Sequence, residues 1–219
     1  MSKNKKISYI LNSIVIVLVL LGIIFMLTGF KFMGDDKLLV SSKGYENFKF
    51  FTVDSNVLMG LSALLFLIYY KKGEVPKWVK LLKFAGTVSV ALTFVTVVFY
   101  LAPFSGYDFL AFFINNNLFF HLIVPILSIV TFICFDGLYN VKNKELLYGL
   151  VPMVLYSIYY MALSFTHIKN GVVEEGYDWY GFLGKDVSVI SAIVVVLVML
   201  GSTYLLGYLL NLANKKVNK

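Results

Sequence analysis

Phe48-Lys49-Phe50-Phe51-Thr52-Val53-Asp54-Ser55-Asn56-Val57-Leu58-Met59-Gly60 opens the second long apolar segment of the chain, which continues to about residue 70. This length suits one crossing of a bilayer. Its start is unusual because Thr52, Asp54, Ser55 and Asn56 lie within five residues. Polar groups need partners once they leave water, so such a cluster in a spanning helix indicates a functional site. The same residue types also cap helices at an interface, and both interpretations are open.

The composition is that of a membrane protein. The 219 residues are 59% hydrophobic and 14% charged, with a mean hydropathy of +0.83, which the surface of a soluble domain would not tolerate. We therefore predict an all-α, polytopic membrane protein: a single domain over residues 1–219, folded as a bundle of six transmembrane helices. Apolar runs long enough to cross a bilayer lie near residues 7–30, 48–70, 80–102, 118–137, 146–166 and 187–210. The first lacks a signal-peptide cleavage site and is too long for one.

The charged residues predict the orientation. All nineteen basic residues are lysines, and thirteen lie in the amino terminus, residues 71–83, residues 138–145 and the carboxyl tail. This bias places both termini in the cytoplasm of a cell-membrane protein. It also explains the net charge of +7 without a nucleic-acid partner. A single cysteine, Cys134, excludes an intramolecular disulfide and a cysteine-based metal cluster.

The topology brings polar residues of distant segments to one depth. Thr52 is expected about one turn below the outer end of its helix, and His121 starts the fourth span at the same level. A threonine needs a base to become a nucleophile, and neutral imidazole suits that role. Alternatively, His121 is a buried histidine that serves helix packing. A metal site of both histidines with Asp54 or Asp108 lacks the usual spacing, so no metal is expected.

The outer loop over residues 167–186 is rich in aromatic residues. His167 ends the fifth span, and Tyr177, Trp179 and Tyr180 follow it. Tyrosine and tryptophan are typical of the headgroup level of a membrane. The loop is therefore either an interfacial belt or a lid over a site, because loops often carry function.

Three stretches resemble the androgen-induced-gene family and its bacterial relatives. FFTVDSNVL (residues 50–58) resembles the family's YFTxxSN(L/I)L helix opening, LFFHLIVPIL (118–127) its LxHxxxPxL helix, and DWYGFL (178–183) its YPYPFL segment. The resemblance covers residues 45–186. In characterised animal members, a threonine and a histidine are the catalytic pair of a membrane hydrolase that cleaves fatty acid esters of hydroxy fatty acids. The resemblance implies that Thr52 and His121 are the corresponding catalytic pair in this chain. Here CFDG (134–137) replaces a common Asp-Trp ending, and DWYGFL lacks the prolines.

Two functions follow as expectations. The first is a hydrolase or acyl-transfer enzyme without a cofactor, which acts on a membrane lipid or fatty-acyl ester near the outer leaflet. Ser55, Asn56, Tyr107 or an amide of the 167–186 loop would stabilise the oxyanion. The second is a non-catalytic lipid or small-molecule binding or transport subunit. The size suits bacterial vitamin-uptake subunits, but residues 12–27 lack their small-residue dimer face.

Overall fold

The computed structural model describes residues 3–33, 44–136, 141–183 and 188–218. The long helices are α1 (Lys3–Thr28), α2 (Phe51–Lys71), α3 (Lys77–Thr96), α5 (Val124–Cys134), α6 (Val151–Thr166) and α7 (Val189–Val217). Shorter elements connect them: η1 (Tyr45–Lys49), η2 (Val97–Leu101), α4 (Ala102–Phe104), η3 (Phe109–Phe113), η4 (Leu118–Ile123) and η5 (Asn143–Leu150). The short strands β1 (Ile168–Lys169) and β2 (Val172–Val173) form an antiparallel pair after α6.

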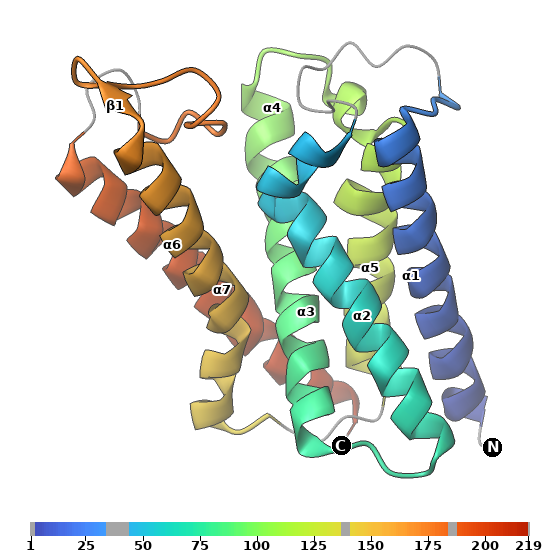
Figure 1. Ribbon diagram of the computed structural model, residues 1–219. Coiled ribbons are helices and arrows are strands. Elements are labelled where there is room, and N and C mark those ends of the chain that lie inside the picture. The colour runs from blue at the N-terminus through green and yellow to red at the C-terminus, as the bar shows by residue number, and fades with distance from the viewer. Residues whose placement is uncertain (1–2, 34–43, 137–140, 184–187, 219) are drawn as a thin grey trace.

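Helices α1, α2, α3 and α5 form the main bundle (Figure 1). Its interior is filled by side chains from all four helices, such as Val15, Met59, Val90 and Val124, each fully buried. Small residues let the helices approach closely, as is common in membrane bundles. A Cβ added to Gly86 of α3 would lie 3.2 Å from the Cα of Met59 on α2. The backbones of α2 and α3 are therefore in near contact at this level.

Helices α6 and α7 form a second limb of the molecule. Figure 1 shows them leaving the end of α3 that lies near the chain termini and diverging from α2 toward the end that carries β1. Exposed apolar side chains occur along the whole length of α7, including Ile190, Leu197 and Leu205. An apolar helix with so much exposed surface suits contact with lipid rather than with water.

The helices have the length and composition of membrane spans. Within the described residues, five helical stretches are long and apolar enough to cross a bilayer: Lys3–Thr28, Phe51–Lys71, Lys77–Phe104, Asn143–Thr166 and Val189–Val217. The predicted all-α fold is confirmed in its helical character, and these five stretches have the length and composition that a membrane protein requires. The stretch Leu118–Cys134 is apolar but shorter, and it begins with the π-helical turns of η4.

Several helix limits differ from those predicted. The third helix begins at Lys77 rather than at 80, the helical stretch before α6 begins at Asn143 rather than at 146, and α7 continues to Val217 instead of 210. These ends carry lysines, whose long side chains reach water while their helical backbone continues. The predicted limits at 137 and 187 lie outside the described residues.

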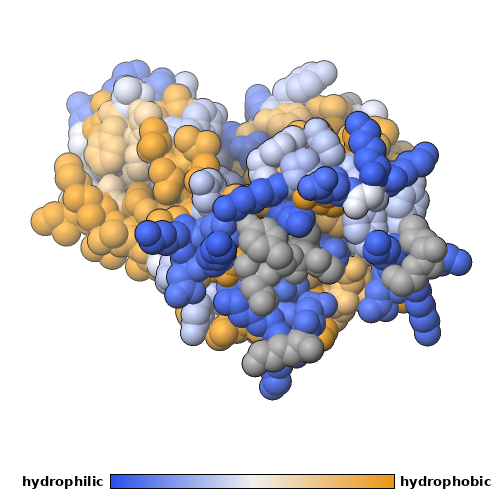
Figure 2. Space-filling view, turned by 90° about the horizontal axis from the view of Figure 1, so that it is seen from below, coloured by the Kyte–Doolittle hydropathy of each residue, from blue (hydrophilic) through white to orange (hydrophobic). Residues whose placement is uncertain are grey.

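Both chain ends lie at the same end of the molecule (Figure 1). Figure 2, seen from this end, shows hydrophilic side chains gathered over it and apolar side chains on the flank. The exposed lysines here include Lys6, Lys71, Lys144 and Lys216. The first turn of α2, which contains Thr52, lies toward the opposite end.

Candidate active site

The start of α2 is held by a side chain from another part of the chain. Phe50 has an extended backbone, and no side chain of the Thr52–Asn56 cluster caps the helix. Instead, the backbone N–H of Phe51 donates to the hydroxyl of Tyr180, at 2.9 Å. The capping interpretation of the cluster is therefore wrong for the first turn of α2.

Thr52 lines a small cavity between the two limbs. The cavity has a volume of about 50 Å³ and is walled by α2, α3, η2, α6, α7 and the loop after β2. Its walls are mostly apolar and include Leu92, Met153 and Phe182, together with the hydroxyl-bearing Ser157. In the described part of the chain, the Thr52 hydroxyl forms no hydrogen bond, so it is available to a bound molecule.

Ser55 and Asn56 hold the backbone at Thr52. The Ser55 hydroxyl and the Asn56 amide both donate to the Thr52 carbonyl, at 3.0 and 2.7 Å. Ser55 also lies 3.0 Å from the hydroxyl of Thr93 on α3, and Asn56 donates to the carbonyl of Phe120 at 3.0 Å. Both side chains are almost fully buried. They fix the first turn of α2 against α3 and η4, so they position Thr52 and do not enter the small cavity.

His121 lies in η4 with 4% of its surface exposed. Its Nδ1 is 2.7 Å from the carbonyl oxygen of Phe112 in η3. A carbonyl oxygen only accepts hydrogen bonds, so Nδ1 carries the proton. In the neutral ring the lone pair is then on Nε2, which is the arrangement that a general base requires. A π-helical turn of this kind is often found at functional sites.

The structure places Thr52 and His121 on neighbouring helices without joining them directly. Asn56 links the carbonyl of Thr52 to that of Phe120, which precedes His121. In the described ranges no hydrogen bond connects the two side chains, and His121 is not among the residues around the small cavity. Their joint action stays a prediction.

The aromatic loop lies over the small cavity through Tyr180 and Phe182. Trp179 donates to the Tyr156 hydroxyl at 3.0 Å and packs edge-on against Tyr160, with ring centroids 4.8 Å apart. Asp178 accepts from the Tyr160 hydroxyl and from the backbone of Phe182 at 3.0 Å. Burial raises the pKa of Tyr180 to about 12, so this residue is a neutral phenol at physiological pH.

The remaining predicted site residues lie outside the small cavity. Tyr177 stacks on His167 with ring centroids 3.6 Å apart. His167 Nδ1 contacts the carbonyl of Leu163 at 2.9 Å, within its own helix end. Tyr107 is about half exposed in the connection between α4 and η3. Among the described side chains, no group of three or more His, Cys, Asp or Glu could hold a metal ion.

A larger groove adjoins the small cavity. It has a volume of about 970 Å³ and runs between α2 and α3 on one side and η5 and α6 on the other. Phe51 and Tyr156 belong to the walls of both spaces. Trp78, Leu81 and Leu155 give the groove an apolar surface. The groove and the small cavity that Thr52 lines are therefore adjacent, with Phe51 and Tyr156 between them.

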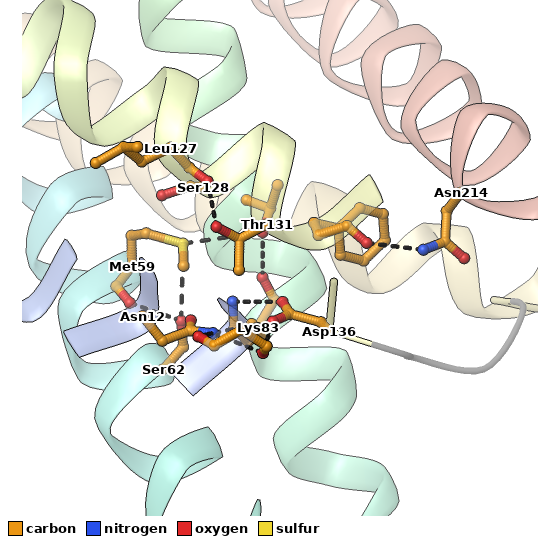
Figure 3. Close-up of polar contacts among 12 residues, drawn as sticks. Asn12, Met59, Ser62, Lys83, Leu127, Ser128, Thr131, Asp136 and Asn214 are labelled. Carbon is orange, nitrogen blue, oxygen red and sulfur yellow. Dashed lines mark hydrogen bonds and ion pairs between the residues drawn. The ribbon is translucent and has the colours of Figure 1, made fainter. Parts of the chain in front are cut away.

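A buried charge cluster that was not predicted from the sequence joins α1, the second turn of α3 and the residues after α5 (Figure 3). Lys83 Nζ lies 2.8 Å from Asp136 Oδ2, and neither side chain is exposed. Ser8 and Asn12 of α1 donate to the other carboxylate oxygen, at 2.8 and 2.9 Å. Lys83 was counted among the lysines of residues 71–83 that indicate the orientation, but it lies in the second turn of α3 with its charge buried. A signal was present, because Lys83 stands between apolar residues.

Comparison with known protein families, with characterised proteins and with solved structures finds no match for this chain.

Proposed function

We propose that the protein is an integral-membrane hydrolase of fatty-acyl esters, in which Thr52 is the nucleophile and His121 the general base. The observation that carries the proposal is the position of Thr52. Its hydroxyl has no hydrogen-bond partner in the described part of the chain, and it lines a small cavity that shares Phe51 and Tyr156 with a long apolar groove. An ester carbonyl would fit the small cavity while its acyl chain occupies the groove.

The tautomer of His121 supports its role. With Nδ1–H bonded to the Phe112 carbonyl, Nε2 can accept the proton of the Thr52 hydroxyl, directly or through one water molecule. Catalytic hydrogen bonds are often long in a ligand-free enzyme and shorten when substrate binds. The resemblance of both flanking stretches to a family with a threonine and histidine pair supports the same assignment.

The reaction would proceed in two stages. The Thr52 oxygen attacks the ester carbonyl as its proton passes to His121, and the tetrahedral intermediate collapses when His121 returns the proton to the leaving alcohol. Water then hydrolyses the acyl-threonine with the same base. Ser157 supplies a hydroxyl in the small cavity for the oxyanion.

The proposal includes six spans, with Leu118–Cys134 as the sixth, and both termini in the cytoplasm. The lysine distribution and the hydrophilic end in Figure 2 support this orientation. A cysteine at Glu175, in a chain with Cys134→Ser, should react with an impermeant thiol reagent on intact cells. If the cysteine reacts only after the cells are permeabilised, the orientation is the reverse of the proposed one.

A non-catalytic lipid-binding protein is the second candidate. One observation favours it: within residues 3–33, 44–136, 141–183 and 188–218, no hydrogen bond joins Thr52 to His121. A binding protein would need only the groove and the small cavity, with His121 as a packing residue.

Hydrolysis of 4-nitrophenyl decanoate by the purified protein tests the assignment. Thr52→Ala, His121→Ala and the double variant should lose similar activity, because residues that act as one unit are not additive. Thr52→Ser should retain part of it. Thr28→Ala, an exposed threonine at the end of α1, should behave as wild type. A folded Thr52→Ala protein with wild-type turnover would rule out the nucleophile.

A further inference from the structure

The large groove contains an acidic side chain at its outer end. Asp54 of α2 belongs to its lining, together with the rings of Tyr156 and Tyr159. In the described part of the chain, the Asp54 carboxylate has neither a hydrogen bond nor an ion pair. A carboxylate beside apolar and aromatic walls favours a positively charged ligand, because tyrosine rings also attract cations.

The basic residues around the groove are engaged elsewhere. Lys77, at the inner end, lies 2.6 Å from the buried carboxylate of Glu145. Lys49 precedes α2, and its ammonium lies 5.5 Å from the ring centre of Phe50 and 5.8 Å from that of Trp179. Among the described residues that line the groove, Asp54 is thus the charged residue that can pair with a ligand.

The groove is long enough for an alkyl chain. Gly86 of α3 lies opposite Met59 of α2. Asp54 comes five residues before Met59, and the two helices run in opposite directions, so Asp54 is level with residue 91 of α3. At a rise of about 1.5 Å per residue, the path from Lys77 to this level measures about 21 Å. The hydrocarbon of one leaflet is about 15 Å deep. A single extended chain can therefore follow the groove from Asp54 to Trp78.

We propose that the groove binds a single-chain amphiphile with a positively charged amine or quaternary ammonium group. The cation lies against Asp54 between the rings of Tyr156 and Tyr159, and the chain extends along Leu81 toward Trp78. The inference rests on the proposed function for the place of the acyl chain, and it adds the charge of the headgroup. A fatty acid would instead bring its carboxylate next to Asp54, and like charges repel.

Native mass spectrometry of the protein in dodecyl maltoside can compare three probes at equal concentration: octadecyltrimethylammonium, octadecanol and stearate. None contains an ester, so the result does not depend on whether Thr52 is a nucleophile. The ammonium probe should be retained about tenfold more than stearate, as a partly desolvated charge pair allows. Leu82→Trp, which fills the groove, should reduce retention of all three probes.

Two carboxylate variants decide the role of Asp54. Asp54→Asn should remove the preference for the ammonium probe, and Asp54→Glu should restore much of it. Asp108→Asn is the matched control, because Asp108 is an exposed helix-capping residue outside the groove whose cap an asparagine can replace. Equal retention of the three probes by the wild type would indicate contact with lipid of any kind and overturn the proposal. An unchanged preference in Asp54→Asn would also overturn it.

Discussion

The amide of Asn56 on α2 donates to the main-chain carbonyl of Phe120, 3.0 Å away, in the turn that carries His121. The same amide nitrogen donates to the carbonyl of Thr52, at 2.7 Å. One buried side chain thus fixes the two segments from which the proposed catalytic residues project. The register between α2 and η4 depends on this contact.

Replacing Asn56 should therefore reduce both stability and activity. Asn56→Leu leaves the buried carbonyl of Phe120 without its donor, which costs about 1–3 kcal/mol of unfolding free energy. Turnover of 4-nitrophenyl decanoate should fall more than the Michaelis constant rises, because the two proposed catalytic residues lose their alignment. If Asn56→Leu unfolds at a lower temperature but keeps wild-type turnover, Asn56 has only a structural role.

The fully buried ion pair Lys83–Asp136 and the pair Lys77–Glu145, whose lysine is exposed, should respond differently to substitution. Lys83→Met leaves the Asp136 carboxylate buried without its cation, and about 3–5 kcal/mol of stability should be lost. Lys83→Met with Asp136→Asn should recover much of this loss. Lys77→Met breaks the pair with Glu145, in which the lysine side chain is 64% exposed and the glutamate side chain 8%, and it should cost less than Lys83→Met because water screens the Lys77 charge. Thermal unfolding in detergent measures the stability of Lys83→Met, of the double variant and of Lys77→Met. Similar losses for Lys77→Met and Lys83→Met would contradict the burial of the Lys83 pair.

A methyl group at Gly22 should disturb the contact of α1 with the His121 turn. A Cβ there would lie 2.5 Å from the ring of Phe120, which is almost fully buried. We expect Gly22→Ala to cost about 1–3 kcal/mol, as overpacked cores usually do. Gly201→Ala is the control, because a Cβ at Gly201 of α7 meets nothing within 4 Å. It should be neutral or stabilising, since alanine favours a helix. Equal melting temperatures for both variants would show that α1 and η4 are packed loosely.

Alkaline pH should loosen the aromatic loop through Tyr180. Its pKa is raised to about 12 in the folded protein, against about 10 in an unfolded chain. The neutral phenol therefore stabilises the fold below pH 10, and this contribution is lost as pH rises toward 12. Tyr180→Phe should show a smaller fall in melting temperature over this range than the wild type. Tyr107→Phe, at a half-exposed position, should follow the wild type. Identical pH profiles for Tyr180→Phe and the wild type would exclude this coupling.

The sequence located the helices better than it located their contacts. Long apolar runs identify spanning helices because a bilayer forces every backbone group into internal hydrogen bonds. Lys83 was counted only as an orientation signal, because a lysine count does not reveal that Asp136, 53 positions away along the chain, lies opposite it. Such pairs depend on how helices rotate against one another. The same limit applies to Thr52 and His121. The sequence predicts the depth of each residue in its helix, but it does not predict whether the two side chains face one another.

The aromatic loop shows a similar limit. The sequence pointed to Tyr177, Trp179 and Tyr180 together, yet only Tyr180 of these three belongs to the small-cavity wall. Tyr177 turns back to stack on His167. Turn geometry after β2 decides which rings face inward, and composition alone cannot predict it.

The hydrogen bond from the Phe51 N–H to the Tyr180 hydroxyl connects access to the small cavity with the integrity of α2. If the loop moved away to admit a substrate, the first amide of α2 would lose its acceptor, and the turn that holds Thr52 would be free to fray. The loop in its present position therefore stabilises the first turn of α2. Entry of a ligand and the ordering of Thr52, the proposed nucleophile, would then be coupled through this one hydrogen bond.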